Sequence, residues 1–299
     1  MLGALTIHQP ATAAEAADLR ARLGEDAAVY AGGSELLLVM KEGLGRWPHL
    51  IDVKGVAELH ELADGGGTLC IGAAVTHRQL ERSPLVRGRV PLLAEMEREV
   101  ANVRVRNVGT LGGNLCFAEP HSDPATALLV HDARVVLAGP RASRALPIAA
   151  FVVGSYETAL GPDEVLVRVE VPAPPAGAAG AYLKFGFHER PTVGVAVLLV
   201  PSGDAVGEAR VAVGCIGPVP ARLTQVEASL AGTPLAALAA LATTGHARDG
   251  GEVAAVRGDL AALDVVSDLH GTAEYKRHVA GVLVARALAA AAARARSAV

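Results

Sequence analysis

The sequence of 299 residues predicts an α+β protein of two parts. In its first half, short apolar segments typical of strands alternate with segments that carry helix-start signals and helical period. In its second half, strand-like segments follow one another as in an antiparallel meander. A proline- and glycine-rich connector, residues 172–180, separates the two patterns. We therefore expect an N-terminal domain over residues 1–175 and a C-terminal domain over residues 176–299.

Helix-start signals and turn residues order the first half. A capping box, in which a Thr and a Glu or Gln three residues later satisfy the first amides of a helix, begins at Thr12 and again at Thr76. Ser34 follows a glycine pair and is the expected N-cap of another helix. The expected elements are helices over 13–23, from 34, from 76 to before 83, over 90–99 and over 124–131, and strands over 27–31, 49–53, 69–73 and 133–138.

The second half is expected to form an antiparallel meander followed by helices. A strand is expected over residues 165–172, before the connector. The meander strands are expected over 181–187, 193–200 and 209–217, and helices over 224–231 and 272–295. The last helix is rich in Ala and Val, but Arg286 and Arg294 interrupt it, so we interpret it as an amphipathic packing helix. The longest uncharged apolar run, residues 193–200, is far shorter than a membrane span, so none is expected.

Charge and cysteine content exclude several classes of function. The net charge is −4 and no basic block is present, so the sequence has no signature for binding nucleic acid. Cys70, Cys116 and Cys215 are far apart and form no CxxC motif, which excludes a cysteine-only zinc or iron–sulfur site within the chain. The histidines form no HxxxH or HExxH motif, so no metal site is predicted. The cysteines suit a reducing compartment and the N-terminus lacks a signal-peptide pattern, so we expect a cytoplasmic protein.

Two glycine pairs are the strongest functional signal. Residues 31–36 read AGGSEL and residues 110–114 read TLGGN. Glycine allows positive φ and lets a ligand approach successive backbone N–H groups, an arrangement that binds phosphate. Neither pair is followed by the lysine of a Walker A loop, and no GxGxxG motif is present, so backbone amides would make most contacts to the phosphates of a dinucleotide. The alternative is that both pairs form ordinary strand-to-helix turns.

The glycine pairs and their flanking sequences together resemble a known family. The segments AGGSELLLVMKEG, IGAAVTHRQLE and NVGTLGGNLCFAEPHSDPATALLVHDA, with DLHGTAEYKRHVAGVLVARAL near the C-terminus, are similar to the FAD-binding (medium) subunit of molybdenum hydroxylases, the carbon monoxide dehydrogenase and xanthine dehydrogenase family. This resemblance covers nearly the whole chain. It implies a two-part FAD-binding domain of the vanillyl-alcohol-oxidase and MurB (PCMH) type, followed by a smaller α+β C-terminal domain.

The resemblance also implies which residues hold FAD. Residues of both motifs would contact its diphosphate: Ala31, Gly32, Gly33, Ser34, Glu35 and Leu36, and then Thr110, Leu111, Gly112, Gly113 and Asn114. Asp123 would accept hydrogen bonds from sugar or ribityl hydroxyls, cap the helix that begins at Pro124, or do both. Lys184 would lie near the flavin or face solvent from its strand. Leu166 would pack against the cofactor or belong to the core.

Three further positions near these motifs bear on the site. The sequence departs from the family pattern at residues 191–192, where Pro-Thr replaces an acidic residue found after the arginine in many relatives. At this point the resemblance therefore does not imply the flavin's surroundings or the electron acceptor. His121 is expected to line a loop and Cys116 to be a packed thiol, so no residue of the chain is expected to be catalytic.

Three functions remain open on the sequence. The resemblance implies an oxidoreductase component, the FAD subunit of a larger complex. Electrons would pass from a molybdenum-cofactor large subunit to an iron–sulfur small subunit. The FAD subunit would take them from the small subunit and pass them to a soluble acceptor such as NAD, a quinone or oxygen. Both partners would be separate chains, because this chain has no cysteine set for a cluster. The alternatives are a stand-alone FAD-dependent oxidoreductase of the same superfamily and a non-catalytic binding module that has kept the fold. The substrate would be set outside this chain.

Overall fold

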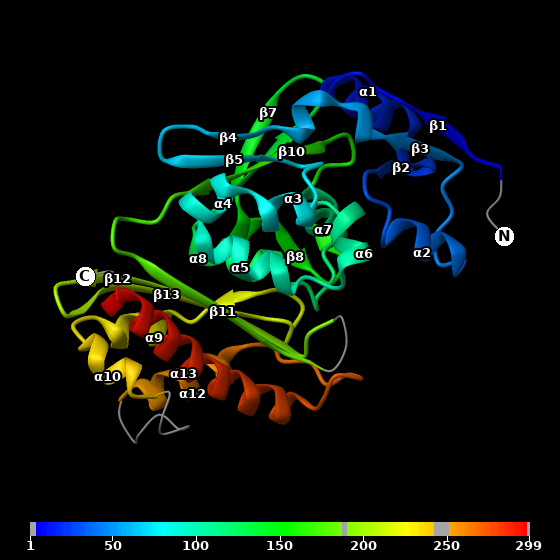
Figure 1. Ribbon diagram of the computed structural model, residues 1–299. Coiled ribbons are helices and arrows are strands. Elements are labelled where there is room, and N and C mark those ends of the chain that lie inside the picture. The colour runs from blue at the N-terminus through cyan, green and yellow to red at the C-terminus, as the bar shows by residue number, and fades with distance from the viewer. Residues whose placement is uncertain (1–3, 187–189, 242–250, 298–299) are drawn as a thin grey trace.

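The structure is a computed structural model that describes residues 4–186, 190–241 and 251–297. Three larger sheets and one two-stranded sheet organise this part of the chain, and helices pack between and around them (Figure 1). The element order and the mixture of helices with parallel and antiparallel sheets confirm the predicted α+β class.

The N-terminal sheet is parallel because helices connect its strands. Its order is β1-β3-β2, with bounds Thr6–His8, His49–Asp52 and Ala27–Tyr30. Helix α1 (Ala13–Leu23) connects β1 to β2, and helix α2 (Leu36–Lys41) lies between β2 and β3. The Thr12 side chain accepts a hydrogen bond from the amide of Glu15, so α1 begins where predicted, but the box is incomplete because the Glu15 carboxylate accepts from the amide of Ala11 instead of Thr12.

Helix α2 begins later than the sequence predicted. Glu35 occupies its N-cap position and makes no side-chain capping bond, so the expected capping role of Ser34 is wrong. The reason lies in Gly33, whose φ of +74° turns the backbone before the helix can start.

The second sheet holds five strands, all antiparallel to their neighbours. Its order is β4 (Leu62–Asp64), β5 (Thr68–Gly72), β10 (Val165–Pro172), β6 (Arg134–Ala138) and β7 (Ser143–Pro147). Strand β10 therefore places the segment before the proline-rich connector in the middle of the N-terminal half. Along it, Val167, Val169 and Val171 are buried while Arg168 is exposed, the period of two of a strand with one face in the core.

Short helices cover this sheet between residues 77 and 130. They are α3 (His77–Arg82), α4 (Pro84–Arg89), α5 (Pro91–Glu99), α6 (Val103–Val108), α7 (Leu111–Phe117) and α8 (Pro124–Val130), and a small hairpin of β8 (Val152–Gly154) and β9 (Glu157–Thr158) follows. Both bonds of the predicted capping box at Thr76 are present. Helices α6 and α7 were not predicted, because one or two turns are too short to show a hydrophobic period.

The C-terminal sheet is the predicted meander, extended by a short fourth strand. Its order is β11 (Ala179–Phe185), β12 (Val193–Ser202), β13 (Ala205–Gly214) and β14 (Ala221–Arg222). Helices α9 (Thr224–Leu230) and α13 (Ala273–Ser297) pack on one face, and α5 and α8 on the other. Strand β12 is apolar along most of its length because both its faces are buried, Val195 and Val197 in one core and Leu198 in the other.

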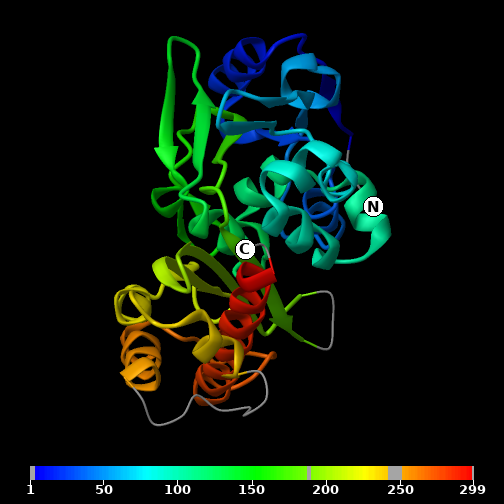
Figure 2. The ribbon, with the colours of Figure 1, turned by 60° about the vertical axis from the view of Figure 1, so that its left-hand side comes forward.

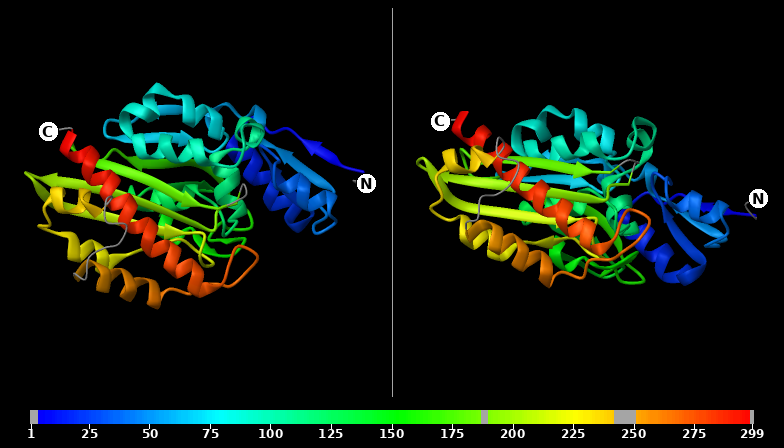
Figure 3. Two further views of the ribbon diagram at one scale, coloured as in Figure 1. Left: turned by 60° about the horizontal axis from the view of Figure 1, so that its bottom comes forward. Right: turned by 90° about the horizontal axis from the view of Figure 1, so that it is seen from below.

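Helix α13 is long and apolar enough to cross a membrane by length and composition, yet half of its most apolar window is buried within the protein. It lies diagonally across the C-terminal sheet (Figure 3). Helices α10 (Leu235–Ala239) and α12 (Gly251–Ala262) pack beside α13. In Figure 2 these C-terminal elements, coloured yellow to red, gather below the segments coloured blue to cyan.

Candidate functional site

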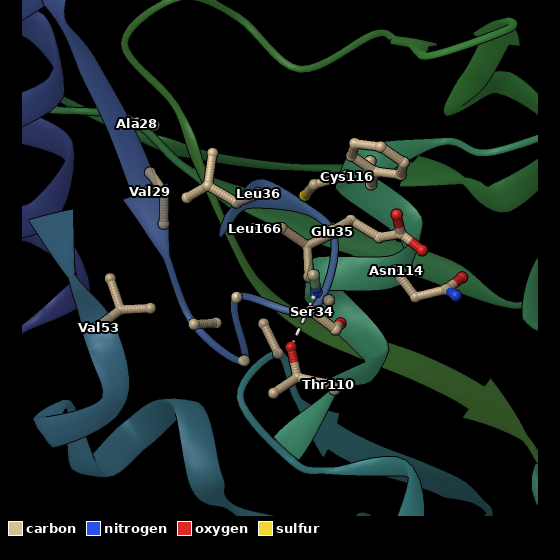
Figure 4. A pocket seen from close by; sticks show the side chains of 18 of the residues that line it. Ala28, Val29, Ser34, Glu35, Leu36, Val53, Thr110, Asn114, Cys116 and Leu166 are labelled. Atoms are coloured by element: carbon tan, nitrogen blue, oxygen red, sulfur yellow. Dashed lines mark hydrogen bonds between the residues drawn. The ribbon is translucent and has the colours of Figure 1, made fainter. Parts of the chain in front are cut away.

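A cavity of about 840 Å³ lies between the N-terminal sheet and the helices that follow it. Ala28 and Val29 of β2 line one side, and Asn114 and Cys116 of α7 line the other (Figure 4). Its volume is within the range of pockets that hold cofactors. Most residues implied by the resemblance line it: Ala31, Gly32, Gly33, Ser34, Glu35, Leu36, Thr110, Gly112, Gly113, Asn114, Asp123 and Leu166. Leu111 and Lys184 do not.

The two glycine motifs touch one another at this cavity. A Cβ atom on Gly32 would lie 2.1 Å from the carbonyl oxygen of Val108, closer than real Cβ atoms approach. The hydroxyl oxygen of Ser34 lies 3.5 Å from the position that a Cβ atom on Gly109 would take. Glycine is therefore required where the two segments meet, and residues far apart in the sequence form one wall.

The first motif presents free backbone donors. The N–H groups of Gly33, Ser34, Glu35 and Leu36 make no hydrogen bond to any described residue. The carbonyls of Gly33 and Glu35 accept hydrogen bonds from the amides of Leu37 and Val39, so these two carbonyls are engaged by the helix while the amides remain available. Successive free amides around a residue with positive φ form a concavity that suits an anion, as predicted for this motif.

The second motif is built differently from the prediction. The amides of Leu111 and Gly112 donate to the carbonyls of Val75 and Ala73, and those of Gly113 and Asn114 donate to Thr110. The expectation that backbone amides of both motifs would be available is therefore wrong for the second, which forms the first turn of α7. The polar groups that it can offer a ligand are side chains, the hydroxyl of Thr110 and the amide of Asn114.

Close packing explains the second glycine pair. A Cβ atom on Gly112 would lie 2.5 Å from that of Ala73, and one on Gly113 would lie 2.8 Å from Oγ1 of Thr110. Neither glycine has a positive φ. Glycine is needed here to seat α7 against the chain at Ala73. Leu111, fully buried on the same helix turn, belongs to the core.

Asp123 forms a buried network with residues of the C-terminal sheet. Its Oδ1 accepts the hydroxyl of Tyr182 at 2.5 Å, and its Oδ2 lies 3.3 Å from Nζ of Lys184. Burial raises the pKa of the Asp123 carboxyl, and the Lys184 cation opposes that rise. Asp123 occupies the N-cap position of α8 with proline in the first turn, as that alternative predicted, but its side chain makes no capping bond. Lys184 is not solvent-facing either, because it also donates to the carbonyl of Glu99.

Arg190, between β11 and β12, connects the C-terminal sheet to the first motif and to the loop after α7. It forms ion pairs with Glu35, 3.1 Å away, and with Glu119, which also accepts the hydroxyl of Tyr156. All three charged residues line the cavity. The cation therefore balances two carboxylates that would otherwise lower the affinity of this edge for an anion. Glu119 had no signal in the sequence, because its partner lies in a distant segment.

His121 and Cys116 behave as predicted. A ring nitrogen of His121 lies 2.9 Å from the carbonyl oxygen of Pro191 and the other lies 3.0 Å from Asp268, so the ring joins the loop before α8 to the C-terminal half. Burial raises the pKa of the Cys116 thiol to about 12, which keeps it neutral and unreactive. Leu166 lines the cavity and is also 3% exposed within the core, so both of its predicted roles are compatible with its position.

Two family models match the chain. The FAD binding domain in molybdopterin dehydrogenase matches residues 3–174, and the CO dehydrogenase flavoprotein C-terminal domain matches residues 188–291. The chain belongs to the family of FAD-binding subunits of molybdopterin dehydrogenases. The family predicted from the glycine motifs and their flanks is therefore confirmed, and with it the cofactor, FAD.

Individual relatives extend over the full length of the chain. The carbon monoxide dehydrogenase medium chain of Hydrogenophaga pseudoflava is 36% identical over 289 residues, 96% of each chain. The nicotine 6-hydroxylase medium subunit of Paenarthrobacter nicotinovorans is 30% identical over 294 residues, 98% of this chain and 99% of that one. A solved structure of carbon monoxide dehydrogenase from Hydrogenophaga pseudoflava matches with a TM-score of 0.90 at 35% identity and covers 98% of this chain and 99% of its own. The fold predicted for the family is confirmed.

The cavity has the groups that FAD requires. Free amides of the first motif can donate to a diphosphate, and the glycines allow it to approach the backbone. Apolar side chains, among them Val29, Val53 and Leu160, line other parts of the cavity and suit the faces of aromatic rings. The residues present therefore fit this cofactor.

Proposed function

We propose that this chain is the electron-transfer FAD subunit of a molybdenum hydroxylase. Electrons pass from a molybdenum-cofactor large subunit to an iron–sulfur small subunit. This chain receives them from the small subunit and passes them to an external acceptor. The observation that carries the proposal is the convergence of both glycine motifs on one cavity of cofactor size. The names of the relatives, medium chain and medium subunit, support a place among several chains.

We assign FAD binding to both motifs, in different ways. Residues 31–36 hold the diphosphate with their amides and with the Ser34 hydroxyl, while Thr110 and Asn114 contribute side-chain donors. Gly112, Gly113 and Leu111 set the position of α7, on which these side chains depend. Asp123 accepts hydrogen bonds from hydroxyl groups of the cofactor, and Leu166 contributes apolar surface. Lys184 acts through Asp123 by balancing its charge.

The chemistry in this proposal belongs to FAD, which can accept and release electrons when bound. The chain binds and orients it and keeps water from its buried parts. We also propose that residues 1–175 form the FAD-binding domain and residues 176–299 the C-terminal domain. We also propose a cytoplasmic location, because Cys70, Cys116 and Cys215 are all free thiols, which suits a reducing compartment.

The test is isolation of the chain with its native partners, followed by an absorption spectrum and metal analysis. Flavin together with iron and molybdenum is the expected result, with flavin lost from the subunit when Gly33 is replaced by Val. Flavin without either metal would favour the stand-alone oxidoreductase instead. A colourless preparation that takes up no added FAD would overturn the assignment of the cavity. The relatives are named for carbon monoxide and for nicotine, which supports the proposal that the substrate is set outside this subunit.

A further inference from the structure

A buried histidine and carboxylate meet on the cavity wall beside both glycine motifs. His77, the first residue of α3, is 2% exposed and lines the cavity. Its Nδ1 lies 2.7 Å from Oε2 of Glu97 on α5, which is fully buried. Neither residue has a role in the FAD site as assigned above. The sequence placed His77 only inside a capping box, where its neighbours Thr76 and Gln79 carried the signal.

The Glu97 carboxylate orients the imidazole ring. A carboxylate accepts hydrogen bonds, so Nδ1 carries a hydrogen and Nε2 points away from Glu97. No described residue forms a hydrogen bond with Nε2. This atom is not fully buried, whereas both ring nitrogens of His131 are buried and have no partner among the described residues. The other oxygen of Glu97 has no partner among the described residues. Because a buried carboxylate with so few partners is costly, the hydrogen bond from Nδ1–H of His77 stabilises Glu97.

Gly109 leaves the space between His77 and the first motif open. A Cβ atom at this position would lie 3.3 Å from Cδ2 of His77, the carbon bonded to Nε2, and 3.5 Å from Oγ of Ser34. Both side chains therefore border the same small space, which a side chain on residue 109 would fill. The His77 ring edge thus lies next to the amides proposed to hold the diphosphate.

We propose that His77 is a direct ligand of the FAD diphosphate, with Nε2–H of its imidazolium donating to a phosphate oxygen and Glu97 holding the ring in place. This inference rests on the proposed FAD site and deepens it. It supplies the cationic donor that the sequence motifs lack, at the point where the amides of the second motif are already used. Phosphate oxygens accept hydrogen bonds only, so this bond requires a hydrogen on Nε2 as well as the one on Nδ1.

Affinity for FAD should therefore fall when His77 is replaced, because the substitution removes the donor. The cations on the surrounding elements are paired with carboxylates or exposed: Arg78 and Arg106 with Glu81, Arg89 with Asp64, Lys184 with Asp123, Arg190 with Glu35, and the exposed Arg82, Arg87, Arg98 and Arg104. The Glu97 carboxylate is the one ionisable group that bonds directly to the His77 ring among the described residues.

The experiment uses the full-length chain, freed of flavin and titrated with FAD by fluorescence. We expect His77→Gln to weaken binding about tenfold to hundredfold, the worth of a hydrogen bond to a charged group. In Glu97→Gln, the amide oxygen still accepts from Nδ1–H, so the loss is smaller. The ³¹P resonances of bound FAD should differ in chemical shift between the natural chain and His77→Gln.

His131→Gln is the matched control. His131 is also buried, at 1% exposure, but it follows α8 and does not line the cavity, so FAD affinity should be unchanged. If His77→Gln loses no more affinity than this control, or if its ³¹P resonances match those of the natural chain, His77 is a core residue only and the FAD site stands without it. If the natural chain itself binds no FAD, the proposed function and this inference both fail.

Discussion

Replacing Gly32 by Ala tests whether the contact between the two glycine motifs creates the FAD site. The new Cβ would lie 2.1 Å from the carbonyl oxygen of Val108, 2.8 Å from its carbonyl carbon and 2.9 Å from Cα of Gly109. All three are backbone atoms, so no side-chain rotation can relieve the overlap. The two segments must separate by about 1 Å before these contacts become ordinary. Overpacking of this kind costs about 1–3 kcal/mol of stability.

The separation should affect FAD binding more than it affects folding. It moves the Ser34 side of the cavity away from the Thr110 side, so a diphosphate cannot keep all of its contacts to both. Losing one hydrogen bond to a charged group costs about 1.5–3 kcal/mol, so affinity should fall at least about tenfold. We would measure FAD affinity by fluorescence quenching and stability by urea unfolding.

Gly88→Ala is the control for this substitution. Gly88 lies in α4, no atom is within 4 Å of its built Cβ, and it does not line the cavity. Alanine there should leave FAD affinity unchanged and stabilise the helix by up to about 1 kcal/mol. If Gly32→Ala binds FAD as tightly as Gly88→Ala does, the contact between the motifs does not determine the site and the reasoning is wrong.

Two further predictions concern charge. Burial, with a contribution from Arg210, lowers the pKa of His131 to about 4 from 6.5, so the unfolded chain binds its proton first as pH falls. The free energy of unfolding should therefore drop by up to about 3 kcal/mol between pH 6.5 and pH 4. Urea unfolding of His131→Gln should lack this dependence on pH, and an equal dependence in both proteins would contradict the prediction. Arg190→Gln leaves Glu35 and Glu119 unbalanced, so FAD affinity should fall several-fold at low salt and less at high salt, and a salt-independent loss would refute this.

Local signals predicted those parts of the structure that depend on neighbouring residues. The capping residues Thr12 and Thr76 begin helices where expected, because a cap needs only the next three residues. The meander of the C-terminal sheet followed from its alternating and apolar runs. Short helices such as α6 and α7, and the delayed start of α2, escaped prediction because one turn has no period and because the φ of Gly33 is decided by its packing.

The site divides in the same way. The sequence by itself determined the family, the cofactor and the positions of both glycine motifs, since these are carried by residue types in a fixed order. Only the tertiary structure decided that the amides of Leu111 and Gly112 donate to the carbonyls of Val75 and Ala73 and are not free for a ligand. It also decided that His77 lines the same cavity as both glycine motifs. Hydrogen bonding and burial join segments far apart along the chain. Which donor remains free for a ligand is therefore settled only after every segment has found its partner.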